Sequence, residues 1–233
     1  MNLIKDHWSK KDIKEFNDYL LSIKKPDKID FTRRVVNTNM EVLGISCPTC
    51  KDIAKQIHGG NYYEFLEMND YKYYESTQVS SYLINYIKDV KEKEKFINEL
   101  YMDNWATVDT LKFNVKNQEK EFLDLSKKYI KSKEPFKRRV GVRILFSYTS
   151  SEYVDEIFDI MDSLNKEKEY YVNMAVAWLG CELMIKNRKK MLEYLKHHKL
   201  NSFTLNKMIS KCHDSFRISD ADKAYLKKLK KEN

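Results

Sequence analysis

Apolar side chains recur every three or four residues along most of the chain, which is the period of an amphipathic helix. The clearest stripes run through residues 10–23, 79–87 and 151–164. Breaks between stripes fall at Lys25-Pro26-Asp27, at Gly59-Gly60, at Lys133-Glu134-Pro135 and around Asn165. We find no convincing strand. The pattern therefore predicts an all-α protein of roughly twelve to fourteen helices.

Pairs of helices repeat in the C-terminal half. Three segments open a helix with an aromatic residue, Phe136, Tyr171 and Phe203, at spacings of 35 and then 32 residues. Each is preceded by another amphipathic segment: residues 119–131, 151–164 and 188–197. Such pairs are typical of HEAT or armadillo solenoids, although any all-helical protein shows pairs like these. We predict a single domain over residues 1–233, a right-handed solenoid of HEAT-like repeats with a concave basic face.

The amino-acid composition also favours a helical protein, and the absence of long apolar runs bears on its location in the cell. The chain has five glycines and three prolines, which are few for a sheet protein with many turns. No apolar run approaches the roughly 18 residues that a membrane span needs. The first residues, MNLIKDHWSKKD, have no apolar core of a signal peptide. We therefore expect a cytoplasmic protein with no membrane partner.

The charge balance points to an anionic partner. A net charge of +8 suits nucleic acid, although a biased genome composition would also enrich lysine. Arginine is more informative because it is scarce. Five of the seven arginines fall in two clusters, Arg33-Arg34 and Arg138-Arg139 with Arg143. Clustered arginines suit bidentate contacts with phosphate.

The four cysteines include one CxxC motif, Cys47-Pro48-Thr49-Cys50. A thioredoxin-like motif would sit between a strand and a helix of a βαβ unit, and no such pattern surrounds it. A zinc site would need two further ligands at a recognisable spacing, and none is found. The interpretation we favour is two reduced cysteines at the start of a helix, with no metal and no cofactor. A redox role would require exposed thiols with a lowered pKa.

A tryptophan and an aspartate lie four residues apart in DNWATVDTL, residues 103–111. Positions i and i+4 share a helix face, so Trp105 and Asp109 are expected to be neighbours. Taken alone, Trp105 could equally be a core residue, and Asp109 could be a capping or salt-bridging acid.

Two arginines repeat this spacing in the later helix PFKRRVGVRILF. Val140 and Ile144 can face the core, so we expect Arg139 and Arg143 to project from a helix face that is not packed in the core. Trp178 lies in VNMAVAWLGCEL, which is apolar nearly all round. That local pattern alone favours core packing for Trp178.

These motifs occur together in one order: a tryptophan four residues before an aspartate, an arginine pair opening a later helix, and a tryptophan in a third helix. In this combination the chain resembles the bacterial DNA alkylation repair enzymes of the AlkD type, which are DNA glycosylases built from HEAT-like repeats. The resemblance runs from about residue 30 and is carried by VLGISCPTCKDIAKQI, DNWATVDTL, FKRRVGVRILFSY, YYVNMAVAWLGCEL and, more weakly, FTLNKMISKCHDSFRIS.

The resemblance implies a monofunctional glycosylase that releases cationic N3- or N7-alkylated purines from duplex DNA without a tight base-flipping pocket. It implies that Asp109 is the catalytic carboxylate and that Trp105 and Trp178 pack against the deoxyribose and backbone at the lesion. Arg139 would contact a phosphate, and Arg138 and Arg143 are its candidate companions at the DNA. The enzyme would act as a monomer without a cofactor.

The chain departs from the family pattern in two places. The stretch Ser46-Cys47-Pro48-Thr49-Cys50 stands where the family more often has a basic, carboxylate-containing stretch. The helix that bears Asp109 is expected to continue as TLKFNVKNQEKEF, where the usual family pattern is less recognisable.

The implied chemistry needs one acid rather than a pair. An N-alkylated purine is already cationic and is therefore a good leaving group. What remains is an electron-poor sugar of oxocarbenium character, which one ionised carboxylate can stabilise while it orients a water. Aromatic faces also attract a cationic sugar or base, by about 0.5–2 kcal/mol per contact. The alternative function is a non-catalytic HEAT-like module that binds nucleic acid or protein.

Overall fold

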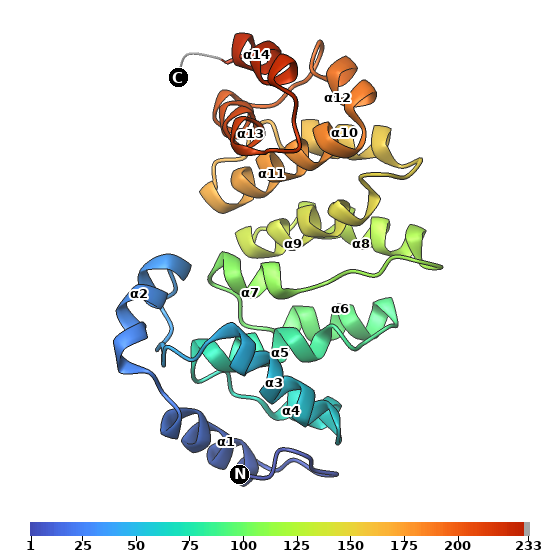
Figure 1. The fold of residues 1–233 in the computed structure, drawn as a ribbon. Coiled ribbons are helices and arrows are strands. Elements are labelled where there is room, and N and C mark those ends of the chain that lie inside the picture. The colour runs from blue at the N-terminus through green and yellow to red at the C-terminus, as the bar shows by residue number, and fades with distance from the viewer. Residues whose placement is uncertain (231–233) are drawn as a thin grey trace. The chain divides into compact units, whose positions relative to one another are not determined.

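Residues 1–230 are described by a computed structural model, and the all-α prediction is confirmed (Figure 1). This part of the chain contains fourteen α-helices and one 3₁₀ turn. It has no strand, and its one isolated β-bridge joins Glu41 to Tyr73. None of these helices is long and apolar enough to cross a membrane.

The chain divides into two compact units, Met1–Phe113 and Asn114–Asn233. Unit 1 contains α1 (Lys10–Ser22), α2 (Pro26–Val36), α3 (Cys47–His58), α4 (Tyr62–Met68), α5 (Tyr74–Ile84), α6 (Val90–Glu99) and α7 (Trp105–Thr110). Unit 2 contains α8 (Glu119–Ile130), α9 (Pro135–Leu145), the 3₁₀ turn η1 (Phe146–Tyr148), α10 (Val154–Ser163), α11 (Tyr170–Lys186), α12 (Arg188–Tyr194), α13 (Ser202–Asp214) and α14 (Asp220–Lys228). The single domain over 1–233 and the right-handed solenoid with its concave basic face stay predictions.

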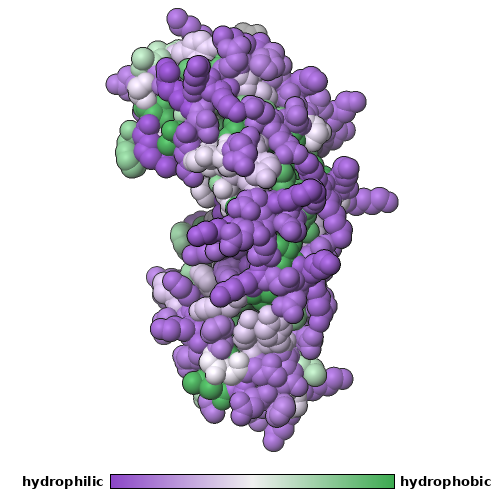
Figure 2. All heavy atoms as spheres, turned by 90° about the vertical axis from the view of Figure 1, so that its right-hand side faces the viewer, coloured by the Kyte–Doolittle hydropathy of each residue, from purple (hydrophilic) through white to green (hydrophobic). Residues whose placement is uncertain are grey.

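Short polar residues start several helices of unit 1. Ser9 begins α1 as a capping box with Asp12, because each side chain accepts from the other's backbone amide. Ser46 begins α3 in the same position, with Pro48 in the first turn, where a missing amide proton is harmless. Most apolar residues of both helices are buried, as Ile13, Phe16 and Leu20 are in α1. The face of the molecule drawn in Figure 2 is coloured mainly as hydrophilic.

A buried carboxylate joins α5 to the loop before α3. Glu75 is 0% exposed and accepts from the Leu43 amide at 3.0 Å and the Ile45 amide at 3.1 Å. Gly44, between them, has φ +77°, and a side chain there would meet the Lys25 carbonyl oxygen at 2.5 Å. The loop therefore packs against the start of α2 only with glycine at this position.

The start of α5 differs from the sequence prediction. The stripe at residues 79–87 placed this helix too late, since α5 begins at Tyr74 and ends at Ile84. Its first turns bury four polar residues: Glu75, Ser76, Thr77 and Gln78. A buried polar turn carries no apolar period, so the pattern could not reveal it.

Unit 2 confirms the predicted alternation of helices. The expected segments 119–131, 151–164 and 188–197 form α8, α10 and α12, although α12 ends three residues early at Tyr194. Helix α8 packs on α9, α9 on α11, and α11 on α13. At the first contact a Cβ on Gly141 would lie 2.9 Å from the Ser126 carbonyl oxygen, so α8 and α9 approach closely.

Candidate active site

The six-residue helix α7 carries both Trp105 and Asp109. Asn104 begins it, because its side-chain oxygen accepts from the Thr107 amide at 2.9 Å. The helix ends at Thr110, so the expected continuation through TLKFNVKNQEKEF is wrong: residues 111–118 are not helical. A helix this short is unstable by itself, and α7 must be held by its neighbours.

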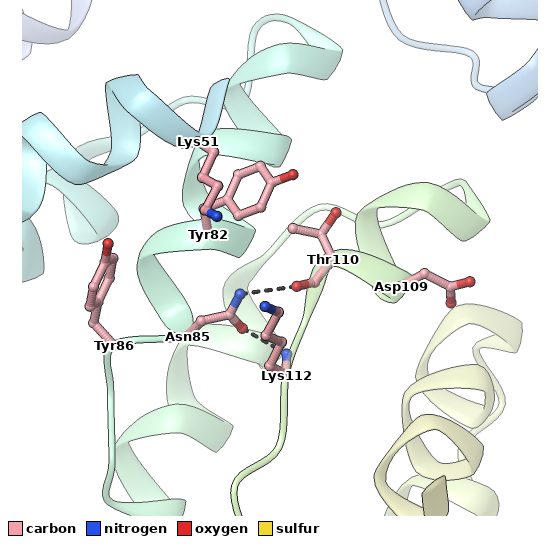
Figure 3. Close-up of a pocket in the computed structure, with 7 residues that line it drawn as sticks. All are labelled: Lys51, Tyr82, Asn85, Tyr86, Asp109, Thr110 and Lys112. Carbon is pink, nitrogen blue, oxygen red and sulfur yellow. Dashed lines mark hydrogen bonds between the residues drawn. The ribbon is translucent and has the colours of Figure 1, made fainter. Parts of the chain in front are cut away.

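Four side chains, which we call the α5–α7 latch, hold it. Gln78 is 1% exposed; its Nε2 donates to the Thr107 hydroxyl at 3.0 Å, and its Oε1 accepts from the Thr110 hydroxyl at 2.9 Å. Asn85 donates to the Thr110 carbonyl oxygen at 3.0 Å and accepts from the Lys112 amide at 2.7 Å, as the dashed lines in Figure 3 show. The latch (Gln78, Asn85, Thr107 and Thr110) thus fixes the position and the end of α7.

Trp105 is partly buried and is tied to helix α2. Its indole Nε1 donates to the Val35 carbonyl oxygen at 3.1 Å. Just before α7, Asp103 accepts from the Thr38 hydroxyl and the Asn39 amide, both at 2.7 Å. Trp105 is therefore not fully buried as a core residue would be, and its orientation is fixed from the α2 side.

Asp109 is partly buried and lies at the edge of an open pocket of about 470 Å³ in unit 1. The pocket is lined by Lys51, Tyr82, Asn85, Tyr86, Asp109, Thr110 and Lys112. Figure 3 shows the Asp109 carboxylate pointing away from the two lysines. The carboxylate is therefore turned away from Lys51 of α3 and from Lys112, which follows α7.

Trp178 lies at the surface of unit 2, so the core packing that its local pattern favoured is wrong. Its side chain is 37% exposed. Phe146 meets its ring edge-on at 5.2 Å between centroids, and the Arg143 guanidinium lies 5.1 Å from the ring centre. The Lys211 ammonium lies 5.9 Å from the same centre. The indole therefore has two cations within about 6 Å of its centre, the range of cation–π attraction.

Arg138 forms an ion pair with Glu167 within unit 2. Its guanidinium donates to Glu167 at 2.7 and 3.1 Å and to the Ser132 and Lys133 carbonyl oxygens at 3.0 Å. Burial alone would raise the pKa of Glu167, but the hydrogen bonds from Arg138 and from two backbone amides outweigh it and lower this pKa. The pair therefore holds α9 to the segment before α11.

The expectation that Arg139 projects from a face outside the core is wrong. The residue is 5% exposed, and its Nη1 donates to the Tyr171 carbonyl oxygen in the first turn of α11. Because α11 packs along α9, it covers the face on which Arg139 lies. Arg143, four residues later, is only partly buried and lies 4.5 Å from the Phe146 ring centre.

The CxxC motif does not have the features of a redox pair. Cys47 is exposed, but Cys50 is buried, and burial raises its pKa well above the ordinary value. Both thiols are free. Among residues 1–230, no group of three or more His, Cys, Asp or Glu side chains is arranged to hold a metal ion.

Sequence reasoning missed several residues around the site. Gln78 and Asn85 were missed because a polar side chain whose partners lie on another helix leaves no periodic signal. The sequence also did not single out three lysines, because lysine is abundant in the chain and no local pattern distinguishes Lys51, Lys112 and Lys211.

An all-helical chain that carries an acid on a short, hydrogen-bonded helix, and an exposed tryptophan near two cations, fits an enzyme that acts on an anionic substrate. The family model for DNA alkylation repair enzymes matches residues 16–211. This match spans most of the chain, and the protein belongs to that family. Membership implies DNA as the substrate. No match to a curated protein was found.

Proposed function

We propose that the protein is a monofunctional DNA glycosylase that removes cationic N3- or N7-alkylated purines from duplex DNA, with Asp109 as the catalytic carboxylate. The observation that carries this proposal is the placement of Asp109. It stands on a short helix whose position is fixed by hydrogen bonds with Gln78 and Asn85, and its carboxylate points away from the nearby lysines. Such fixed placement is what electrostatic stabilisation of a transition state requires.

The reaction breaks one bond and forms another. The C1′–N bond of the alkylated nucleotide breaks, and its electron pair neutralises the positive charge of the departing base. The carboxylate stabilises the oxocarbenium character left at C1′ and orients a water. The water oxygen then bonds to C1′, and its proton leaves to the carboxylate or to solvent. The products are the free alkylpurine and an abasic site, and no second acid is needed.

The tryptophans and Arg143 suit the sugar and phosphate at the lesion. Neither tryptophan is fully buried, which supports the roles that the family resemblance assigns to Trp105 and Trp178. Arg143 lies beside Trp178, so it can contact a phosphate while the indole packs against the backbone. For Arg138 and Arg139, a phosphate contact would require exchanging the Glu167 carboxylate or the Tyr171 carbonyl oxygen for a phosphate oxygen.

The test is release of 7-methylguanine and 3-methyladenine from methylated duplex DNA. Wild type should release both, and Asp109→Asn should lose about two to three orders of magnitude in rate while its affinity for DNA is kept. Asp52→Asn is the matched control, because Asp52 is an exposed carboxylate of α3 that does not line the pocket.

Equal rates in wild type and Asp109→Asn would remove Asp109 from the mechanism. A wild-type protein that binds DNA but releases no base would refute the glycosylase and leave the non-catalytic binding module.

A further inference from the structure

The pocket beside Asp109 combines positive charge, hydrogen-bond donors and an aromatic wall. Lys51 comes from α3, Tyr82 from α5, and Tyr86 and Lys112 from the segments that follow α5 and α7. Lys51, Tyr86 and Lys112 are exposed, so a ligand can reach the pocket from solvent. Its volume of about 470 Å³ lies in the range of small-ligand sites and exceeds what a single ion needs.

The polar groups of the pocket are suited to an anion. Lys51 and Lys112 supply two positive charges, and the Asp109 carboxylate is turned away from them (Figure 3). Burial raises the pKa of Tyr82, so its hydroxyl remains a neutral hydrogen-bond donor near neutral pH. The backbone amide of Lys112 donates to the Asn85 side-chain oxygen at 2.7 Å. This hydrogen bond fixes the point at which the Lys112 side chain starts.

The aromatic wall is preformed. Tyr86 is 39% exposed and stacks on His58, with 3.7 Å between ring centres and 23° between planes. Tyr62 lies near both rings, with its centre 5.0 Å from that of His58 and 6.5 Å from that of Tyr86. A supported and accessible ring is a surface on which a base or a deoxyribose can pack. Basic side chains beside such a ring are typical of sites that hold a nucleic-acid strand.

We propose that this pocket is a strand-binding subsite, in which Lys51 and Lys112 contact the phosphate backbone of the DNA and Tyr86 packs against the adjoining sugar or base. The subsite lies alongside α7, whose Asp109 borders it with the carboxylate turned away from both lysines (Figure 3). It therefore positions the strand next to the reacting nucleotide without bringing a phosphate against Asp109. This inference rests on the proposed function for the identity of the ligand, DNA.

The test is the affinity for a fluorescein-labelled duplex, measured by anisotropy between about 50 and 200 mM salt. Lys51→Ala/Lys112→Ala should weaken binding about 25-fold and lower the slope of log Kd against log salt by about one to two. Tyr86→Ala should weaken binding about fivefold with an unchanged slope, because a stacking contact releases no counterion.

Two variants control for charge and folding. Lys14→Ala/Lys24→Ala makes the same charge change at two exposed lysines of unit 1 outside the pocket, and should leave the slope unchanged. Lys51→Arg/Lys112→Arg keeps the charge and should bind DNA within about threefold of wild type, which separates lost contacts from lost folding.

The outcomes separate the subsite from the catalytic proposal. If wild type releases no base but Lys51→Ala/Lys112→Ala still weakens DNA binding, the subsite stands while the glycosylase fails. Equal salt slopes for the pocket variant and wild type would overturn the subsite. A competition arm with inorganic phosphate and dTMP distinguishes the source of the phosphate. If the pocket variant loses only the binding of these free anions and keeps its affinity for duplex, the inference is also overturned.

Discussion

The latch predicts that Gln78→Leu will impair catalysis more than it impairs folding or DNA binding. Leucine has nearly the volume of glutamine but can neither donate to Thr107 nor accept from Thr110. Both hydroxyls keep another partner, since Thr107 also pairs with Thr77 at 3.1 Å and Thr110 can donate to the Ala106 carbonyl oxygen at 3.0 Å. The substitution therefore removes two hydrogen bonds without leaving a hydroxyl entirely unsatisfied.

The magnitude follows from these contacts. Two net hydrogen bonds are worth about 1–3 kcal/mol, and the apolar leucine side chain at a 1% exposed position offsets part of that. We expect a loss of about 1–2 kcal/mol, which leaves a domain of ordinary stability folded. Because the lost bonds are those that fix α7, the displacement should fall on Asp109. A shift on the order of 1 Å at a catalytic group lowers the rate by up to about 100-fold.

The assay compares kcat for alkylpurine release, duplex affinity and amide exchange in α7. Gln78→Leu should lower kcat at least about tenfold, keep the Kd within about twofold, and speed exchange in α7 about tenfold. Ser81→Ala is the matched control, because Ser81 is equally buried on α5 and its hydroxyl donates within that helix, to the Thr77 carbonyl oxygen at 2.9 Å.

Either of two results would refute the reasoning about Gln78. The first is a kcat that falls equally in Gln78→Leu and in Ser81→Ala. The second is unchanged exchange in α7 of Gln78→Leu, which would show that other contacts hold the helix. The exchange experiment needs no substrate, so its result is independent of whether the proposed reaction occurs.

Three further predictions concern stability. Burial lowers the pKa of Lys93 to about 8, so the unfolded chain binds more protons between about pH 8 and 10. Thermal melts of wild type relative to Lys93→Met should therefore show stability rising with pH across that window. The pKa of Glu167 is lowered chiefly by Arg138 against the effect of burial, so its contribution is present above about pH 4.5 and lost on acidification. In denaturation experiments at several pH values, Glu167→Gln should lose less stability on acidification than wild type does. Gly141→Ala should lower the Tm by several degrees, because the new methyl lies 2.9 Å from the Ser126 carbonyl oxygen; a raised Tm, as helix propensity alone predicts, would contradict the close packing.

The helices were predictable because their apolar residues repeat with the helical period. Segments 10–23, 119–131 and 151–164 match α1, α8 and α10 within a few residues. Predictions from this period were wrong where a helix buries polar residues or exposes apolar ones. The first turns of α5 bury polar residues, and α11 is so uniformly apolar that its pattern could not show that Trp178 faces outward.

The candidate site was predictable only as a set of residues. The i and i+4 rule placed Trp105 and Asp109 on one helix. It could not show that this helix stops at Thr110, because the stop depends on Asn85, 25 residues earlier in the chain. In the same way, the pairing of Arg138 with Glu167 joins residues 29 apart. Contacts of this kind are set by tertiary packing, and local spacing carries no signal for them.

The dependence of α7 on α5 limits how this chemistry could be moved to another protein. A peptide of residues 105–110 would carry the tryptophan and the acid but would be a random coil in water. The smallest fragment that could keep Asp109 on its support runs from Tyr74 to Lys112, because it must include Gln78, Asn85 and the α7 backbone that they bind. Recombination within that stretch would separate the acid from its support. We expect α5, α6 and α7 to behave as one indivisible module in chimeras and in truncations.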